Sequence, residues 1–445
     1  MRTTISLDHQ PEPSGRSRVR MLMRVEAEEP AAGTRTPLDL ALVLDRSGSM
    51  SGRKLAAATK AAGMLVRRLR AEDVIAVVAY DDQVVTVAEP ATGAAQPDLA
   101  RRIEAIRAGG STNLSGGWLR GRELVARTRT DGAVRRVLLL TDGLANVGIT
   151  DPASLVGLCA VARTEGITTT TIGVGEDYDE TLLAAMADAG GGHTYFIESP
   201  DQAPAIFTEE IGDLLAVSAQ NLRVTVLPSP WARIAIVHHA YPRTDVHGGA
   251  CYDMGDLYAR EPGVLLAEFL IEPIAAAADS VDVAELVVEA DVIVDGGRIE
   301  RREVRLPIRF SPAEGPSVDP AIRREVLLFE AARARREALE RRARGDDDGA
   351  QYTLREASSL LELAAAGDAE IEEEARDLGG IADVFARHAV RETDVKYMHQ
   401  RAYDQSRARR KKSELIARRK PAPAAPSAPP PEDGGAPPSA GGSAG

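Results

Sequence analysis

Short apolar runs alternate with longer amphipathic segments between Leu38 and about Val217. The apolar runs have the length and composition of buried strands, and they cover Leu38–Leu44, Val74–Tyr80, Val134–Leu140 and Ile167–Val174. A weaker run, Gln83–Ala88, is a candidate for a hairpin with the strand before it. The amphipathic segments predict helices over Arg53–Arg70, Pro97–Arg107, Gly116–Arg129, Pro152–Thr164, Asp179–Ala189 and Asp201–Val217. This alternation predicts an α/β domain at residues 36–217, with a mainly parallel sheet between two layers of helices.

The chain on both sides of this domain has strand patterns without intervening helices. Two strands are expected before it, over Thr3–Leu7 and Val19–Ala27. Further strands are expected after it, over Leu222–Leu227, Arg233–His238, Val264–Ile271, Val283–Val292 and Arg298–Ile308. Strands separated by turns alone predict an antiparallel β-sandwich at residues 218–312. Because the early strands, within residues 1–35, have no obvious partner in the α/β domain, we predict that they complete the sandwich around it.

Apolar residues recur at helical spacing over residues 318–418, which predicts a bundle of three or four helices. A basic run from Arg407 to Lys420 closes this region. For that run, a solvated helix end is preferred over contact with an acidic partner, nucleic acid or a membrane surface. Residues 421–445 are mostly Pro, Ala, Gly and Ser, so we expect this tail to be disordered.

The composition narrows the class of protein. A chain of 445 residues with 44% hydrophobic content suits two or three domains. The formal net charge of −13 argues against a general nucleic-acid binder. The cysteines, Cys159 and Cys251, fall in different predicted domains, so no disulfide framework is expected. We expect a cytoplasmic protein, because no signal-peptide pattern is present and no stretch approaches the roughly 18 apolar residues of a membrane span.

Oxygen-bearing side chains follow two of the predicted strands. Asp45 ends the first strand of the α/β domain, with Ser47 and Ser49 at alternate positions after it, and Asp142 follows a later strand. Thr112 lies in a glycine-rich loop ahead of a predicted helix. The carboxyl ends of parallel strands meet at one edge of the sheet, where open α/β folds bind ligands. Two carboxylates there repel each other unless a cation lies between them, and such oxygens suit Mg²⁺, Mn²⁺ or Ca²⁺.

The order Asp45-x-Ser47-x-Ser49, then Thr112, then Asp142 in a Thr-Asp-Gly sequence resembles the metal-ion-dependent adhesion site of von Willebrand factor type A domains. All five positions carry that family's residue types, and the resemblance covers about residues 38–215. It implies a Rossmann-like fold with Mg²⁺ at the top of the sheet, with Mn²⁺ or Ca²⁺ as alternatives. It also implies an open coordination position on the ion, which an Asp or Glu of a protein partner commonly fills.

The preferred function is therefore metal-dependent protein–protein interaction by an adhesion or scaffold protein of the bacterial multidomain type, and not catalysis. A second hypothesis is an accessory subunit of a MoxR-like or chelatase-like ATPase machine, with the ATPase on a separate protein. A third is a Mg²⁺-dependent phosphatase that resembles the haloacid dehalogenases. It is disfavoured because Ser47 stands where those enzymes need a second Asp as the general acid.

Two other groups of polar residues have weaker chemical interpretations. Asn113 and Asn146 lie in neighbouring loops and could extend the metal site, but stabilisation of turns is the preferred role for asparagine there. His238, His239 and His247 lack the spacing of a zinc site. Ordinary core or surface histidines are therefore expected.

Overall fold

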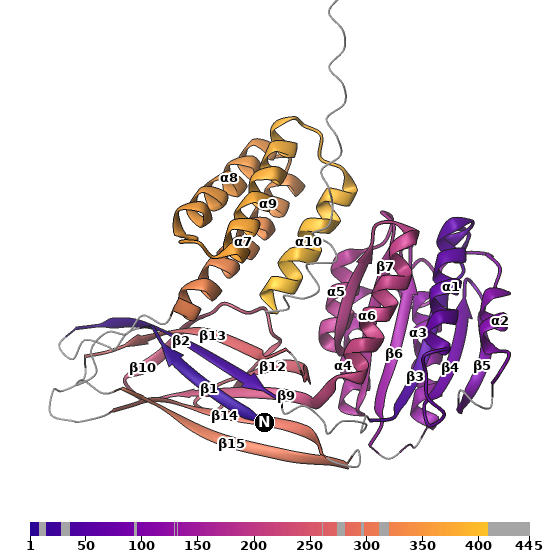
Figure 1. Cartoon of the computed structure of the whole chain (residues 1–445), viewed down its shortest axis with the longest axis horizontal. Coiled ribbons are helices and arrows are strands. Elements are labelled where there is room, and N and C mark those ends of the chain that lie inside the picture. The colour runs from indigo at the N-terminus through magenta and orange to yellow at the C-terminus, as the bar shows by residue number, and fades with distance from the viewer. Residues whose placement is uncertain are drawn as a thin grey trace, which may run out of the picture.

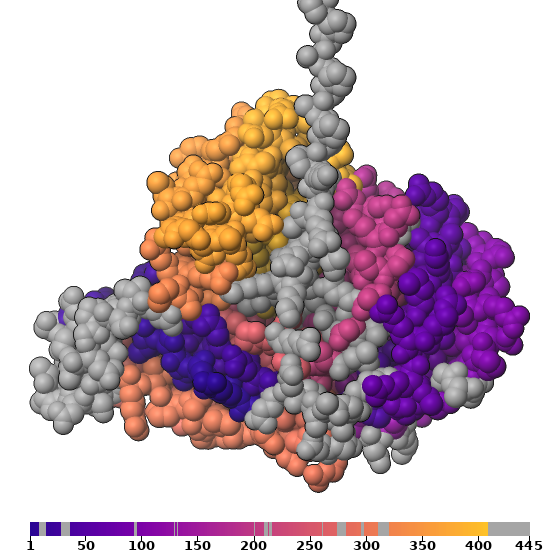
Figure 2. All heavy atoms as spheres, viewed as in Figure 1, coloured from indigo at the N-terminus to yellow at the C-terminus, as the bar shows by residue number. Residues whose placement is uncertain are grey.

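The computed structural model describes residues 1–8, 15–27, 36–92, 96–128, 130, 132–259, 261–273, 281–294, 298–310 and 320–407. The chain forms an α/β domain, a β-sandwich and a helical bundle (Figure 1). In the space-filling view of Figure 2, the bundle, in orange and yellow, rests on the sandwich and reaches the magenta part of the α/β domain. The predicted fold class, an α/β domain combined with a sandwich and C-terminal helices, is confirmed.

A six-stranded sheet with the order β5-β4-β3-β6-β7-β8 forms the centre of the α/β domain. Its strands are β3 (Leu38–Asp45), β4 (Val74–Tyr80), β5 (Val84–Thr92), β6 (Val134–Thr141), β7 (Ile167–Val174) and β8 (Gly191–Ile197). Neighbouring strands pair in parallel except β5, which forms the expected hairpin with β4. The sequence pattern misses β8, which begins with two glycines instead of an apolar run. Gly192 allows β8 to approach β7 closely, because a Cβ there would lie 2.1 Å from the carbonyl oxygen of Thr169.

Helices cover both faces of this sheet. One face carries α1 (Arg53–Val66), α2 (Leu99–Glu104) and α6 (Ala203–Leu215), and the other carries α3 (Leu114–Arg127), α4 (Pro152–Thr164) and α5 (Glu180–Ala189). Along β3, Leu42 and Leu44 join the core beneath α1, whereas Ala41 and Val43 join the core beneath α3. Burial on both faces explains the continuous apolar run of this strand. The predicted helices are present, but α1 and α2 are shorter than the sequence pattern indicates.

Two antiparallel sheets form the sandwich, with the orders β1-β2-β13-β10 and β11-β12-β9-β14-β15. Their strands are β1 (Arg2–Leu7), β2 (Ser17–Glu26), β9 (Val217–Pro228), β10 (Ala232–Val237), β11 (Arg243–Val246), β12 (Gly249–Tyr258), β13 (Gly263–Ile271), β14 (Val281–Val294) and β15 (Arg298–Phe310). Strand β2 precedes the α/β domain but pairs with β13, which follows it, from Ser17 opposite Ile271 to Val25 opposite Gly263. The α/β domain therefore lies between strands of the sandwich in the chain. The sequence pattern misses β11, which has a single apolar residue, and β12, whose apolar residues are interrupted by aspartates.

Buried ion pairs hold the α/β domain against the other two parts. Arg136 of β6 is fully buried and donates to Asp256 of β12 at 2.5 Å. Lys396 of the bundle, whose side chain is 3% exposed, donates to the carbonyl oxygen of Tyr178 at 2.8 Å and to Glu180 Oε2 at 2.7 Å. Because a buried charge without its partner is costly, these contacts favour one orientation of the parts.

The bundle consists of α7 (Pro320–Ala343), α8 (Asp347–Ala364), α9 (Ala369–Ala386) and α10 (Glu392–Ser406). None of the helices in the described part of the chain is long and apolar enough to cross a membrane. The prediction of a solvated helix end is wrong for Arg407, which is buried and donates to Asp188 at 2.6 Å and to the carbonyl oxygen of Ala240 at 3.1 Å. The rest of the basic run and the tail over residues 421–445 lie outside the described residues.

Candidate functional site

The ends of β3 and β6 bring four of the predicted site residues to one edge of the sheet. Asp45 is the last residue of β3, and Ser47 and Ser49 lie in the turn that leads through the short helix η1 (Gly48–Met50) to α1. Asp142 comes directly after β6. Because β3 and β6 are adjacent and parallel, the turns that follow them lie side by side.

A continuous set of hydrogen bonds joins these four residues. Asp45 Oδ1 accepts a hydrogen bond from the backbone N–H of Ser47 at 2.7 Å. The hydroxyl oxygens of Ser47 and Ser49 are hydrogen-bonded at 3.1 Å. The Ser49 hydroxyl in turn donates to Asp142 Oδ1 at 2.7 Å. The result is a compact group of carboxylate and hydroxyl oxygens contributed by two strand ends.

Thr112 reaches the same group from the loop before α3. A Cβ placed on Gly143 would lie 3.2 Å from Thr112 Oγ1 and 3.7 Å from Ser49 Oγ, so both hydroxyls border this glycine. Two backbone N–H groups, of Asn146 and Val147, donate to the carbonyl oxygen of Thr112 at 3.2 Å each. The structure thus brings all five residues predicted from the sequence to one place.

Burial makes the two carboxyl groups of this site electrostatically costly. Asp45 and Asp142 are both fully buried. Burial raises the pKa of the Asp45 carboxyl above its ordinary value, hydrogen bonds from Thr141 and Ser47 oppose the rise, and the nearby Asp142 carboxylate adds to it. The Thr141 hydroxyl donates to Asp45 Oδ2 at 2.6 Å, a contact that the sequence analysis misses. A cation beside such a pair of acids would relieve their repulsion.

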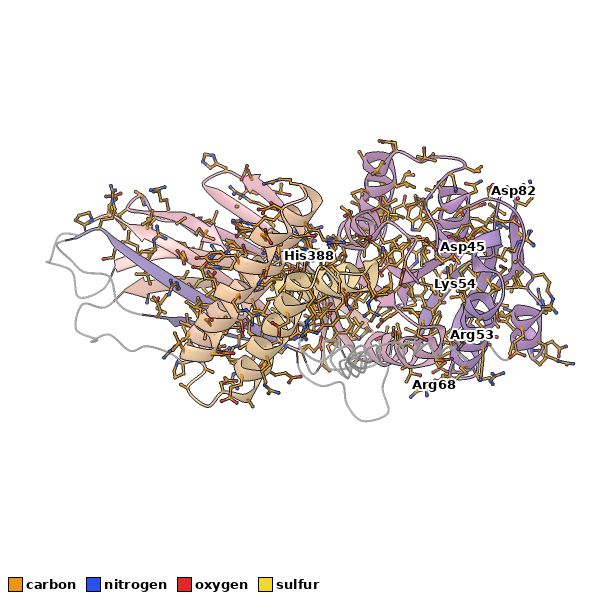
Figure 3. All side chains as sticks on the ribbon, turned by 90° about the horizontal axis from the view of Figure 1, so that it is seen from above. Asp45, Arg53, Lys54, Arg68, Asp82 and His388 are labelled. Atoms are coloured by element: carbon orange, nitrogen blue, oxygen red, sulfur yellow. The ribbon has the colours of Figure 1, made fainter. Side chains whose placement is uncertain are left out.

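Lys54, in the first turn of α1, is a second residue that the sequence analysis misses. Its ammonium donates to Asp142 Oδ2 at 2.6 Å and lies 3.6 Å from Asp177 Oδ2. Ser49 and Lys54 therefore contact different oxygens of Asp142. Figure 3 labels Asp45 and Lys54 in the α/β domain. No local pattern could reveal the pair of Lys54 and Asp142, which are 88 residues apart in the chain.

Asp81, directly after β4, holds the glycine-rich loop in place. Its carboxylate accepts hydrogen bonds from the Arg46 guanidinium and from the backbone N–H of Gly110, both at 3.1 Å. Its carbonyl oxygen accepts from the N–H of Asn113 at 2.8 Å. Burial opposes ionisation of Asp81, but the backbone donors and Arg46 outweigh it and lower its pKa. Gly109 is needed at this point, because a Cβ there would lie 1.9 Å from Asp81 Oδ2.

Asn113, His238, His239 and His247 are placed as capping, core and surface residues. Asn113 is the N-cap of α3, where its side chain accepts a backbone hydrogen bond at 2.9 Å. His238 is hydrogen-bonded to Glu268 at 3.2 Å, His239 is buried, and His247 is exposed. Within the described ranges, no group of three or more His, Cys, Asp or Glu residues is placed to hold a metal ion. A cation site at the ends of β3 and β6 would therefore depend on serine and threonine hydroxyls as well as on its two acids.

Comparisons with known proteins agree with the fold of the α/β domain. The family model of the von Willebrand factor type A domain matches residues 39–209. The uncharacterized protein sll0103 of Synechocystis is 26% identical over 355 residues, which cover 78% of this chain and 83% of sll0103. The uncharacterized protein YfbK of Escherichia coli is 30% identical over 194 residues, or 43% of this chain, but this match spans just 34% of YfbK's own length. A solved von Willebrand factor type A structure from Catenulispora acidiphila has the same fold, with a TM-score of 0.69 and 17% identity over 90% of this chain and 96% of that chain.

Proposed function

We propose that this chain, which carries a von Willebrand factor type A domain over residues 39–209, binds a protein partner through a divalent cation at the ends of β3 and β6. The proposed metal-binding residues are Asp45, Ser47, Ser49, Thr112 and Asp142. The observation that carries the proposal is the set of hydrogen bonds that runs from Asp45 through both serines to Asp142. Mg²⁺ is the proposed ion, with Mn²⁺ or Ca²⁺ as alternatives.

The donor set suits a hard cation. It contains carboxylate and hydroxyl oxygens and includes neither a thiol nor an imidazole. When bound, the ion supplies positive charge and a coordination position that a carboxylate from a partner can take in place of water. The chain contributes the arrangement of the donors: Thr141 holds one oxygen of Asp45, and Ser49 holds one oxygen of Asp142.

Lys54 supports a carboxylate as the partner group. The two ionised acids, Asp45 and Asp142, would neutralise a divalent cation by themselves. Lys54 beside Asp142 adds one positive charge to the assembled site, and the exposed Asp177, 3.6 Å from the Lys54 ammonium, offsets part of it. An Asp or Glu of the partner would cancel this charge, so the site favours an acidic group over a neutral one.

Catalysis is not part of the proposal. The Ser47 hydroxyl, which occupies the place of the phosphatase general acid, is hydrogen-bonded to Ser49. A serine hydroxyl has too high a pKa to protonate a leaving group at neutral pH. A role as the accessory subunit of an ATPase is compatible with the proposal, because such a subunit would also bind its partner through the metal.

Calorimetric titration of the full chain with Mg²⁺ and with Mn²⁺ tests the metal site. We expect one binding site in the unchanged protein and none in Asp45→Ala or Asp142→Ala, while circular dichroism shows intact secondary structure. Asp82→Ala is the matched control, because Asp82 is an exposed acid beside the glycine-rich loop that takes no part in the hydrogen-bonded group (Figure 3). Unchanged metal affinity in Asp45→Ala would refute the proposed site.

A further inference from the structure

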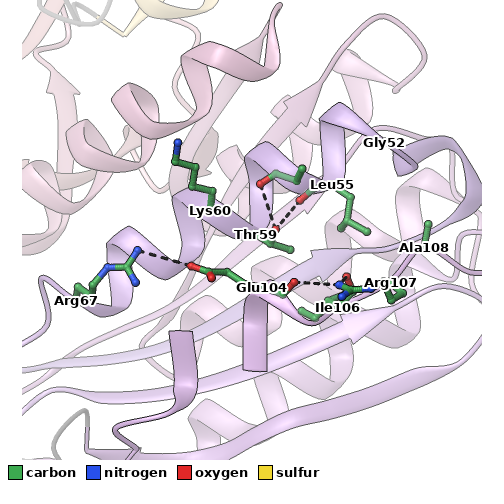
Figure 4. Close-up of a pocket in the computed structure, with 10 residues that line it drawn as sticks. Gly52, Leu55, Thr59, Lys60, Arg67, Glu104, Ile106, Arg107 and Ala108 are labelled. Carbon is green, nitrogen blue, oxygen red and sulfur yellow. Dashed lines mark hydrogen bonds and ion pairs between the residues drawn. The ribbon is translucent and has the colours of Figure 1, made fainter. Parts of the chain in front are cut away.

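A groove with a volume of about 690 Å³ lies beside the proposed metal site, between α1 and the segment that follows α2. It is lined by residues from both segments, among them Gly52, Leu55, Lys60, Ile106, Arg107 and Ala108 (Figure 4). None of these residues takes part in the hydrogen-bonded group at the ends of β3 and β6.

One end of the groove adjoins the loops of the metal site. Figure 4 shows Gly52 and Ala108 near one end and Arg67 at the other. Gly52 immediately precedes α1. Ala108 precedes Gly109, whose N–H donates to the carbonyl oxygen of Arg46 at 2.7 Å in the turn after β3. A peptide with one side chain at the metal could therefore continue directly into the groove.

The rim of the groove is basic. Lys60 and Arg107 are both exposed, and in the described part of the chain neither forms an ion pair with a carboxylate. Arg107 donates instead to the carbonyl oxygens of Glu104 at 3.0 Å and Ile106 at 3.1 Å. The acid on this rim, Glu104, has the Arg67 guanidinium at 3.8 Å. The groove thus carries excess positive charge, with two cations available to a partner.

We propose that this groove binds an extended acidic segment of the same partner that supplies a carboxylate to the metal, so the inference rests on the proposed function. One acid of the segment lies at the ion, and a second acid lies farther along the groove on the basic rim to which Lys60 and Arg107 contribute. Apolar side chains between the two acids pack over the exposed Ala56 and Ala108 and the edges of the buried Leu55 and Ile106, the apolar part of the lining. The basic rim also speeds the association of an acidic partner.

The geometry of α1 sets the spacing of the acids. Gly52 and Lys60 are eight positions apart, which corresponds to about 12 Å along a helix. An extended peptide covers that distance in about four residues. Because the ion lies beyond Gly52, the partner segment is expected to carry two acids at least four positions apart, with apolar residues between them.

Selection from a phage-displayed library of random peptides, with the full chain as bait in Mg²⁺, tests this inference. We expect enriched peptides to show the acidic pair described above. Fluorescence anisotropy with a labelled copy of an enriched peptide then measures affinity. We expect Lys60→Glu combined with Arg107→Glu to weaken binding by about tenfold or more, with Mn²⁺ affinity and circular dichroism unchanged. Arg68→Glu is the control, because Arg68 is an exposed cation just after α1 and outside the groove (Figure 3).

The outcomes separate this inference from the function on which it rests. If EDTA abolishes peptide binding but the double variant binds as tightly as the unchanged protein, the groove is not the site and the proposed function stands. If EDTA leaves peptide binding unchanged, or if no acidic peptide is enriched, both proposals are overturned. If Arg68→Glu weakens binding as much as the double variant does, the effect is general electrostatics and the groove is again excluded.

Discussion

Replacement of Lys54 by methionine removes the positive charge nearest to Asp142 while the length of the side chain is nearly kept. The ammonium lies 2.6 Å from Asp142 Oδ2. Opposite unit charges at this separation attract by about 1.6 kcal/mol even at the dielectric constant of water. The aqueous value is a lower limit, because Asp142 is fully buried and the Lys54 side chain is 26% exposed, and the second contact of Lys54 with Asp177 keeps the net effect near this limit. Since about 1.4 kcal/mol corresponds to a factor of ten, we expect Lys54→Met to bind Mg²⁺ about tenfold more tightly.

Calorimetric titration with Mg²⁺ and electron paramagnetic resonance with Mn²⁺ measure this change in the full chain. The same variant should bind an acidic peptide more weakly, because its metal-loaded site has lost one positive charge. Arg53→Met is the matched control: Arg53 is the neighbouring cation on α1, its side chain is 80% exposed, and it pairs with Asp201. We expect that control to leave metal affinity unchanged.

The direction of the effect decides between two roles for Lys54. If its ammonium competes with the ion for Asp142, metal affinity rises when the charge is removed. If Lys54→Met instead lowers metal affinity, the reasoning above is refuted. Lys54 would then orient the Asp142 carboxylate toward the ion, as residues around metal ligands commonly do.

Three further outcomes are expected. Burial opposes ionisation of Glu374, but two arginines outweigh it and lower its pKa. The stabilisation from this carboxylate is present above the ordinary pKa of a glutamate and is lost as the pH falls through the lowered value. Glu374→Gln should therefore flatten the acid dependence of the melting temperature measured by circular dichroism. Lys396→Met removes the ammonium that donates to the buried carbonyl oxygen of Tyr178 and to the Glu180 carboxylate. The free energy of unfolding measured with denaturant should fall by about 3 kcal/mol, and hydrogen exchange should increase in the loop after β7. Gly117→Ala places a Cβ 2.4 Å from the ring of Tyr80, so it should destabilise the protein by about 1–3 kcal/mol in thermal melts. Gly157→Ala is the control, because nothing lies within 4 Å of its added Cβ, and it should leave the stability unchanged.

Most of the α/β domain, with the exception of β8, could be predicted from local patterns alone. A strand buried on both faces needs an unbroken apolar run, and β3 has one from Leu40 to Leu44. The parallel arrangement follows from the helices between the strands. Because parallel strands end at one edge of the sheet, the sequence also determined that Asp45 and Asp142 would lie near each other. The short spacing of Ser47 and Ser49 after β3 placed both hydroxyls at the same edge.

The contacts that depend on packing between distant segments were decided by the tertiary structure. Lys54 reaches Asp142 because α1 packs against the face of the sheet that adjoins the end of β6. Strand β8 is recognisable by its pairing with β7 and not by its own glycine-rich sequence. The choice of Asp256 as partner for Arg136, 120 residues away, depends on the docking of the sandwich. Local periodicity records which side of an element is buried, but it contains no information about which distant charge or strand will meet that side.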